Sequence, residues 1–152
     1  MSAQCLRTLR GKSNILPKMV ITMNAVELQN VSRIYRADKI ETIALEHINL
    51  TVKEGEFISI MGPSGCGKST LLNIIGLLDS PTEGRVLLRG KELENENLTQ
   101  RAHFRNANLG FVFQSFQLIP SLNVEENVAL PLLYRKCSAK ERNERVTRVI
   151  ER

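Results

Sequence analysis

One short glycine-rich segment constrains the fold of this 152-residue chain more than any other feature. The segment consists of Gly62-Pro63-Ser64-Gly65-Cys66-Gly67-Lys68-Ser69. It follows a mostly apolar run at residues 57–61, which predicts a strand buried on both faces, and it precedes helical spacing at residues 68–78. It matches G-x-x-x-x-G-K-[ST] at every fixed position, in the strand–loop–helix context that this pattern requires. We therefore expect an α/β fold in which this loop binds phosphate groups.

The residue types of the loop fit the chemistry of a nucleoside triphosphate. Glycines at positions 62, 65 and 67 permit backbone torsions and close approaches that a side chain prevents, so successive amides can form an anion-binding nest at a helix N-terminus. Lys68 is expected to contact the β- and γ-phosphates, and Ser69 to offer a hydroxyl ligand to Mg²⁺. Thr70 fits a helix residue better than a second metal ligand, and Cys66 fills a position that the pattern leaves free. The expected ligand is ATP with Mg²⁺.

The distribution of charge argues against a nucleic-acid partner. The formal net charge is +5, but residues 1–22 contain four basic residues and no acid. Of the 21 basic residues, 17 therefore remain in the rest of the chain against 16 acidic residues, a net charge of +1. Because nucleic-acid binding usually requires basic residues clustered on the domain itself, the composition does not predict such a face.

Residues 1–22 form a leader that we expect to be disordered, ahead of a domain at residues 23–152. The leader has no acid and carries Arg and Ser, which is weakly typical of a transit peptide; the other interpretation is an extension before a natural start at Met19 or Met23. Three scattered cysteines are too few for a disulfide framework or a zinc site, which favours a reducing, cytosolic setting. No run approaches the roughly 20 apolar residues of a membrane span.

Hydrophobic periodicity predicts further strands on both sides of the loop. Alternation of apolar and polar residues favours half-buried strands at residues 26–31 and 48–52. Turn residues bracket another strand at 85–89, and an apolar run at 109–114 indicates a second core strand.

The last third of the sequence is predicted to be mostly helical. A polar helix is expected at residues 98–106. Asn123 with Glu126, and Ser138 with Glu141, have the spacing of side chains that cap the N-termini of two further helices.

Two longer stretches resemble the ATP-binding subunit of ABC transporters: GEFISIMGPSGCGKSTLLNIIGLLDSPTEGRVLLRGKEL and LGFVFQSFQLIPSLNVEENVALPLLYR. The first is similar to the Walker A segment and the following hairpin of that family, and the second to its Q-loop and the start of its helical subdomain. The resemblance extends from about residue 26 to the end, and the spacing from Lys68 to Gln114 agrees with it. Within the family, the sequence is most similar to the group that serves macrolide-export and lipoprotein-release permeases.

The resemblance implies a P-loop NTPase fold of the ABC type: a mixed core sheet with helices, a small antiparallel β-subdomain and the start of a helical subdomain, incomplete on the C-terminal side. It implies a subunit that couples ATP binding and hydrolysis to transport through a separate membrane permease, as a dimer with a second ATP-binding subunit. Such a subunit is cytoplasmic and peripheral on the inner face of the cell membrane, with no nucleic-acid partner.

The resemblance also gives roles to two residues outside the loop. Tyr35 falls where the family places an aromatic ring that stacks on adenine; the alternative is a tyrosine at a strand end, packed on the small sheet. Gln114 falls at the Q-loop glutamine, whose amide contacts Mg²⁺ or water at the γ-phosphate; the alternative is a polar residue that ends a strand. Lys68 and Gln114 are thus the expected catalytic contacts, and Ser69 and Gln114 the expected metal contacts.

Other elements of the family are not found in this sequence, namely an LSGGQ-type signature, an apolar strand followed by Asp-Glu, and a switch histidine. His47 and His103 fit surface or structural positions, and Glu125 and Glu126 fit a helix cap rather than a catalytic base. Because a general base and a partner's signature loop are needed for hydrolysis, we expect this chain alone to be inactive. We also expect the strands at 57–61 and 111–113 to have an exposed edge, which favours aggregation.

Two alternatives to a transporter subunit stay open at this point. One is an ABC-type ATPase that acts on nucleic acid, which the near-neutral domain and the apolar stretch at residues 118–120 disfavour. The other is a non-catalytic remnant that binds nucleotide or pairs with a complete subunit.

Overall fold

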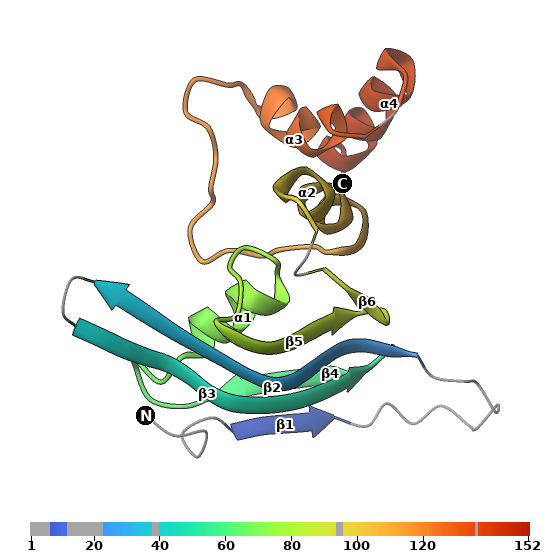
Figure 1. Cartoon of the computed structure of the whole chain (residues 1–152). Coiled ribbons are helices and arrows are strands. Elements are labelled where there is room, and N and C mark those ends of the chain that lie inside the picture. The colour runs from blue at the N-terminus through green and yellow to red at the C-terminus, as the bar shows by residue number, and fades with distance from the viewer. Residues whose placement is uncertain (1–6, 12–22, 38–39, 94–95, 136) are drawn as a thin grey trace. The chain divides into compact units, whose positions relative to one another are not determined.

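The computed structural model describes residues 7–11, 23–37, 40–93, 96–135 and 137–152. The chain divides into two compact units, residues 1–97 and residues 98–152. Within the described residues, the first unit holds every strand and one helix, and the second unit holds three helices (Figure 1). No helix in these ranges is both long and apolar enough to cross a membrane.

A four-stranded antiparallel sheet is the largest element of the first unit (Figure 1). Its strands, in spatial order, are β3 (Ile40–Lys53), β2 (Asn24–Ala37), β5 (Glu83–Leu88) and β6 (Lys91–Glu92). The predicted strands are confirmed, but β2 and β3 extend well beyond the alternating segments. Residues 35–37 of β2 and 40–43 of β3 are exposed, so backbone pairing within the hairpin, rather than burial, keeps these ends extended.

Helix α1 (Lys68–Ile75) supplies the apolar face that packs on this sheet. Its buried residues Leu71 and Ile74 recur at helical spacing, and Leu77 is buried just after the helix. The sheet contributes a set of almost fully buried side chains: Leu28, Val31, Leu45, Val86 and Leu88. The helix is shorter than the predicted 68–78, because Leu77 adopts a left-handed backbone (φ 57°) that ends the helical path after Gly76.

Strand β4 (Phe57–Met61) leads into the glycine loop and pairs antiparallel with β1 (Arg7–Gly11). Within the leader, residues 7–11 form this strand, and the other leader residues, for which we predict disorder, lie outside the described ones. The prediction that β4 is buried on both faces is wrong, since Phe57 and Met61 are exposed and the residues between them are half-buried. Burial on both faces of a strand needs covering layers, and β4 shares its sheet only with β1 among the described strands.

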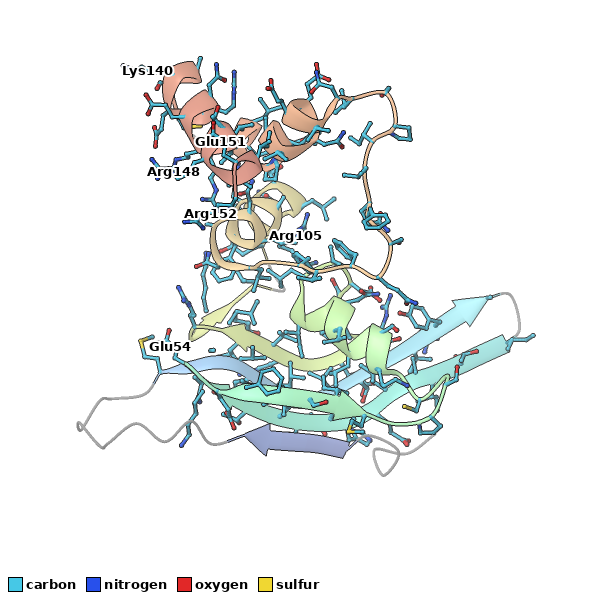
Figure 2. The ribbon with its side chains drawn as sticks, turned by 180° about the vertical axis from the view of Figure 1, so that it is seen from behind. Glu54, Arg105, Lys140, Arg148, Glu151 and Arg152 are labelled. Carbon is cyan, nitrogen blue, oxygen red and sulfur yellow. The ribbon has the colours of Figure 1, made fainter. Side chains whose placement is uncertain are left out.

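The second unit contains α2 (Leu98–Asn108), α3 (Val124–Leu133) and α4 (Ala139–Ile150). Both predicted caps are confirmed: Asn123 and Glu126 form a reciprocal capping box, and the Ser138 side chain accepts a hydrogen bond from the Glu141 amide. Half of the 12 residues of helix α4 are charged, with Lys140 at its start and Arg148 near its end (Figure 2). Val146 is its one buried residue.

The segment between α2 and α3 does not form the predicted core strand at residues 109–114. Phe111 and Phe113 stack with centroids 5.5 Å apart, and Val112 between them is fully exposed. A buried strand must pair its backbone with neighbouring strands, and the described residues of the second unit contain only helices. The apolar pattern is therefore present here without the sheet that would cover it.

Candidate nucleotide-binding site

The glycine loop connects β4 to α1 with two residues in the left-handed region of backbone torsion. Gly65 has φ 77° and Gly67 has φ 87°, values that side-chain-bearing residues rarely adopt. A Cβ atom added to Gly65 would meet no atom within 4 Å, so open space lies over this part of the loop. Residues 62–65 are all exposed. The loop thus presents its backbone to solvent, as binding of a phosphate chain requires.

The N-terminus of α1 carries no competing negative group. Gly67 occupies the N-cap position without any side-chain hydrogen bond, and the first turn contains no acidic residue. The first amides of an α-helix have no acceptor within the helix, and the helix dipole adds partial positive charge there. An anion placed over Gly67 and the first turn would accept hydrogen bonds from these amides and would also be attracted by the partial positive charge.

Lys68 turns its side chain back over the start of the loop. Its Nζ atom donates to the carbonyl oxygens of Gly62 at 2.8 Å and Pro63 at 2.6 Å, and lies 3.6 Å from the Cys66 sulfur. An ammonium group has three donors and no acceptor, so it can exchange these carbonyl contacts for phosphate oxygens without a change of fold. The positive charge therefore already lies at the mouth of the loop.

Cys66 is the one loop residue among 62–69 whose side chain is buried, at 5 % exposure. Its backbone amide donates to the Pro63 carbonyl at 3.4 Å, which closes a turn inside the loop. The thiol thus packs inward while the loop amides stay outside. This arrangement agrees with the interpretation of Cys66 as a packing residue at a free position of the pattern.

The residues at the start of α1 offer too few oxygen ligands to bind Mg²⁺ unless phosphate groups also coordinate it. Ser69 is exposed and Thr70 is half-buried. No group of three or more His, Cys, Asp or Glu side chains that could hold a metal ion occurs in the described part of the chain. Mg²⁺ commonly keeps waters and takes substrate phosphates with one or two protein oxygens, so a single serine hydroxyl suits it.

A backbone contact joins the loop to the β2–β3 hairpin. A Cβ atom added to Gly67 would lie 2.5 Å from the carbonyl oxygen of Ala44 and 2.9 Å from a methyl of Leu45. Ala44 is a bulged residue: Arg33 pairs with Leu45 and Ile34 with Ile43, so Ala44 has no partner of its own. The bulge brings the hairpin backbone against the N-cap of α1.

This contact places Tyr35 in the neighbourhood of the phosphate loop. Tyr35 pairs with Thr42, two residues from the bulge that touches Gly67. Its side chain is 40 % exposed, and its hydroxyl donates to Asp79 at 2.8 Å. The hairpin therefore holds a partly exposed aromatic ring close in register to the bulge that contacts Gly67, and its stacking on adenine stays a prediction.

Gln114 lies in the second unit, in the irregular segment after Phe113, and is exposed. Its expected contact with Mg²⁺ or water stays a prediction. Glu126 accepts a hydrogen bond from the Asn123 amide at 2.8 Å, so its carboxylate is engaged in the cap as expected. His47 lies 3.1 Å from the Asn30 side chain, through Nδ1, in agreement with a structural position.

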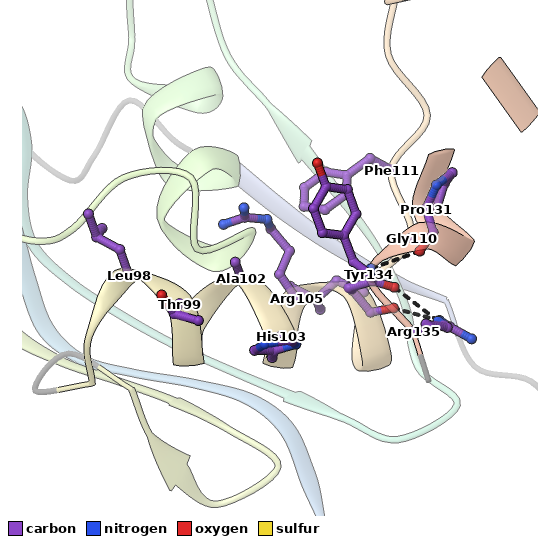
Figure 3. A pocket seen from close by; sticks show the side chains of 12 residues that line it. Leu98, Thr99, Ala102, His103, Arg105, Gly110, Phe111, Pro131, Tyr134 and Arg135 are labelled. Atoms are coloured by element: carbon purple, nitrogen blue, oxygen red, sulfur yellow. Dashed lines mark hydrogen bonds between the residues drawn. The ribbon is translucent and has the colours of Figure 1, made fainter. Parts of the chain in front are cut away.

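Helix α2 and the end of α3 enclose a cavity of about 870 Å³ in the second unit (Figure 3). Its mixed lining includes His103, Phe111 and Tyr134. Arg135 fixes one side of it by donating to the side-chain and backbone oxygens of Asn106, at 3.0 and 2.5 Å. None of the residues predicted to bind nucleotide lines this cavity.

Sequence reasoning missed two structural features of the β2–β3 hairpin. The bulge at Ala44 depends on the register of a long hairpin, and periodicity does not report register. The bond between Tyr35 and Asp79 joins residues 44 positions apart. The only available sign was the spacing of Arg33 and Tyr35, which places both side chains on one face of a strand.

Comparison with known proteins agrees with this geometry. The family described as ABC transporter matches residues 45–152. The chain belongs to the ABC transporter family. It is similar to the lipoprotein-releasing system ATP-binding protein LolD of Aquifex aeolicus, with 50% identity over 119 residues, 76% of this chain and 51% of LolD. It is also similar to the macrolide export ATP-binding/permease protein MacB of Syntrophobacter fumaroxidans, with 42% identity over 123 residues, 81% of this chain and 17% of MacB.

The fold of this ABC family member matches a solved ATP-binding cassette. A dimeric structure of a post-hydrolysis state of MJ0796 from Methanocaldococcus jannaschii, bound to ADP and Pi, has a TM-score of 0.73 at 42% identity. The match covers 83% of this chain and 56% of that one. The predicted P-loop fold of the ABC type is therefore confirmed, as is the similarity to the macrolide-export and lipoprotein-release group. The chain spans about half the length of the curated relatives it matches first.

Proposed function

We propose that this chain binds Mg-ATP at Gly62–Ser69 and is the nucleotide-binding part of an ABC transporter. One observation supports the proposal above all. The N-terminus of α1 is uncapped and has no acid in its first turn, and the ammonium group of Lys68 lies over the adjoining loop. Uncapped amides and a lysine ammonium group at one exposed loop are a strong combination for binding a polyphosphate.

Each loop residue has a proposed part in binding. The amides of the exposed loop residues Ser64 and Gly65, with those of Gly67 and the first turn of α1, surround the phosphate chain. Lys68 transfers its hydrogen bonds from the loop carbonyls to the β- and γ-phosphates. Ser69 offers its hydroxyl to Mg²⁺, and the metal, when bound with the phosphates, neutralises part of their charge. Thr70 supports the first turn of the helix.

Tyr35 and Gln114 complete the proposed site. Structural contacts support the role of Tyr35, and sequence position alone supports that of Gln114. The pairing of Tyr35 with Thr42, beside the bulge that contacts Gly67, supports a role in stacking on adenine. For Gln114, the support is its position in the Q-loop-like sequence, from which we infer contact with Mg²⁺ or with water at the γ-phosphate.

We infer that the chain binds ATP without hydrolysing it at a significant rate on its own. The 152 residues contain no signature loop, no Asp-Glu pair after an apolar strand and no histidine at the switch position. Water activation needs a general base within hydrogen-bond reach, and two acidic candidates are engaged elsewhere, Asp79 with Arg33 and Glu126 in a helix cap.

The proposed partners are an integral-membrane permease and a second ATP-binding subunit, with the complex on the inner face of the cell membrane. Similarity to MacB, an ATP-binding/permease protein, supports the permease, and the dimeric MJ0796 structure supports the second subunit. A nucleic-acid partner has no such support, and the net charge of residues 23–152 is only +1.

Calorimetric titration with ATP, with and without Mg²⁺, tests the binding proposal. We expect one site per chain for the parent protein and at least about tenfold weaker binding for Lys68→Ala, since a hydrogen bond to a charged group contributes about 1.5–3 kcal/mol. Equal affinity in parent and variant would overturn the proposed role of the loop.

A further inference from the structure

Arg33, Tyr35 and Asp79 form a compact cluster around the turn that follows α1. Arg33 and Tyr35 are two positions apart on β2, so their side chains project from the same face of the strand. Asp79 comes from the turn that follows α1. The cluster therefore ties the hairpin that carries Tyr35 to the far end of the helix that begins at the loop.

The carboxylate of Asp79 is the centre of this cluster. Its Oδ2 atom accepts hydrogen bonds from the Arg33 Nε at 3.1 Å and from the Tyr35 hydroxyl at 2.8 Å. Its Oδ1 atom lies 2.8 Å from a terminal nitrogen of Arg33 and accepts from the Ser80 amide at 2.7 Å. The pair with Arg33 is bidentate, and 23% of each side chain is exposed, so it is better shielded than a free surface pair.

Arg33 also covers one face of the Tyr35 ring. The guanidinium carbon lies 4.6 Å from the ring centroid, within the range of a cation–π contact. The hydrogen bond from the hydroxyl to Asp79 sets the direction in which the ring points. The guanidinium of Arg33 covers one face of the ring and limits its rotation. With 40 % of the tyrosine exposed, the accessible part of the side chain is held in one orientation before any ligand arrives.

We propose that Arg33 and Asp79 are positioning residues that hold Tyr35 ready to receive the purine ring of the nucleotide on the face opposite Arg33. The proposal rests on the proposed ATP site, because it assigns residues to the support of its stacking ring. A ring already fixed in its bound orientation loses less conformational entropy on binding, so support of this kind strengthens binding of the base without touching the phosphates.

The test compares one ligand that carries the adenosine group with one that lacks it. Dissociation constants for Mg-ATP and for magnesium tripolyphosphate are measured by calorimetry on the full chain, and the ratio between them reports the contribution of the nucleoside. Tyr35→Ala should lower this preference for ATP about fivefold to tenfold, which is the size expected for loss of an aromatic stacking contact. Binding of tripolyphosphate should stay unchanged in the same variant.

Two conservative variants isolate the positioning role. Tyr35→Phe keeps the ring and removes the hydroxyl bond to Asp79, and Arg33→Lys keeps the charge and removes the planar group that covers the ring. Each should lower the preference for ATP about threefold, the effect expected from freeing one side chain. Arg36→Lys is the matched control: it makes the same substitution on the same strand, in a pair with Glu41 that is mostly exposed. It should leave the preference unchanged.

The outcomes separate this proposal from the function on which it rests. A parent chain that binds tripolyphosphate as tightly as ATP would overturn the stacking role of Tyr35 and, with it, the positioning roles. A preference that falls in Tyr35→Ala but is unchanged in Tyr35→Phe and Arg33→Lys would overturn the positioning roles alone. Equal losses in Arg33→Lys and Arg36→Lys would also overturn them, since a general effect on the hairpin would then explain the result.

Discussion

The carbonyl oxygen of Ala44 lies so close to Gly67 that a Cβ atom on the glycine would stand only 2.5 Å from it. A bulge in one strand and the N-cap of a helix therefore share a contact that only glycine permits. Through this contact, the register of the β2–β3 hairpin determines where Tyr35 lies relative to the phosphate loop. The site depends on packing between two elements that are distant in sequence, in addition to the loop pattern itself.

Gly67→Ala should destabilise the chain more than Gly65→Ala. Both glycines have a left-handed backbone, so either substitution has a conformational cost of about 1–2 kcal/mol. A Cβ at Gly65 meets open space, whereas a Cβ at Gly67 must displace backbone at Ala44, which adds roughly 1–3 kcal/mol. Urea unfolding of both variants measures the difference. Equal losses in the two variants would contradict the proposed packing of the hairpin on the loop.

The pairing of β1 with β4 should protect the strand that leads into the loop. Leu9 pairs with Ser59 in the middle of β1, and a proline there removes an amide and disfavours the strand. We expect Leu9→Pro to speed hydrogen exchange of the β4 amides and to promote aggregation, because an unpaired strand edge recruits other chains. Thr8→Val, which keeps the amide and favours a strand, is the control. Unchanged exchange in Leu9→Pro would show that β1 leaves the β4 edge unprotected in solution.

Removal of the α3 cap should destabilise the second unit. The Asn123 side chain accepts from the Glu126 amide at 2.8 Å, and Glu126 accepts in return from the Asn123 amide. Asn123→Ala should therefore cost about 1 kcal/mol of unfolding free energy. Ser138→Ala, which removes the single cap bond of α4, should cost less. The Glu126→Gln variant should bind Mg-ATP as tightly as the parent, and weaker binding would contradict a purely structural role for this acid.

The sequence was sufficient to predict those parts of the site that depend on local order. The loop from Gly62 to Ser69, the strand before it and the helix after it follow from residues adjacent in the chain, as do the caps at Asn123 and Ser138. The prediction of a strand at residues 109–114 was wrong, because an apolar run forms a strand only where other strands pair with it. The hydrogen bond between Tyr35 and Asp79 could not be predicted from the sequence, because it depends on how the turn after α1 packs beside the hairpin.

Stabilisation by Mg-ATP is the most direct test of the phosphate loop. The free energy of unfolding of the full chain is measured in urea, with and without Mg-ATP at about 100 times its dissociation constant. A ligand bound only by the folded state should then add about 2.7 kcal/mol. Lys68→Ala, measured at the same nucleotide concentration, should lose most of that gain. An unfolding free energy of the parent chain that does not change with Mg-ATP would contradict the account of Gly62–Ser69 as a nucleotide site.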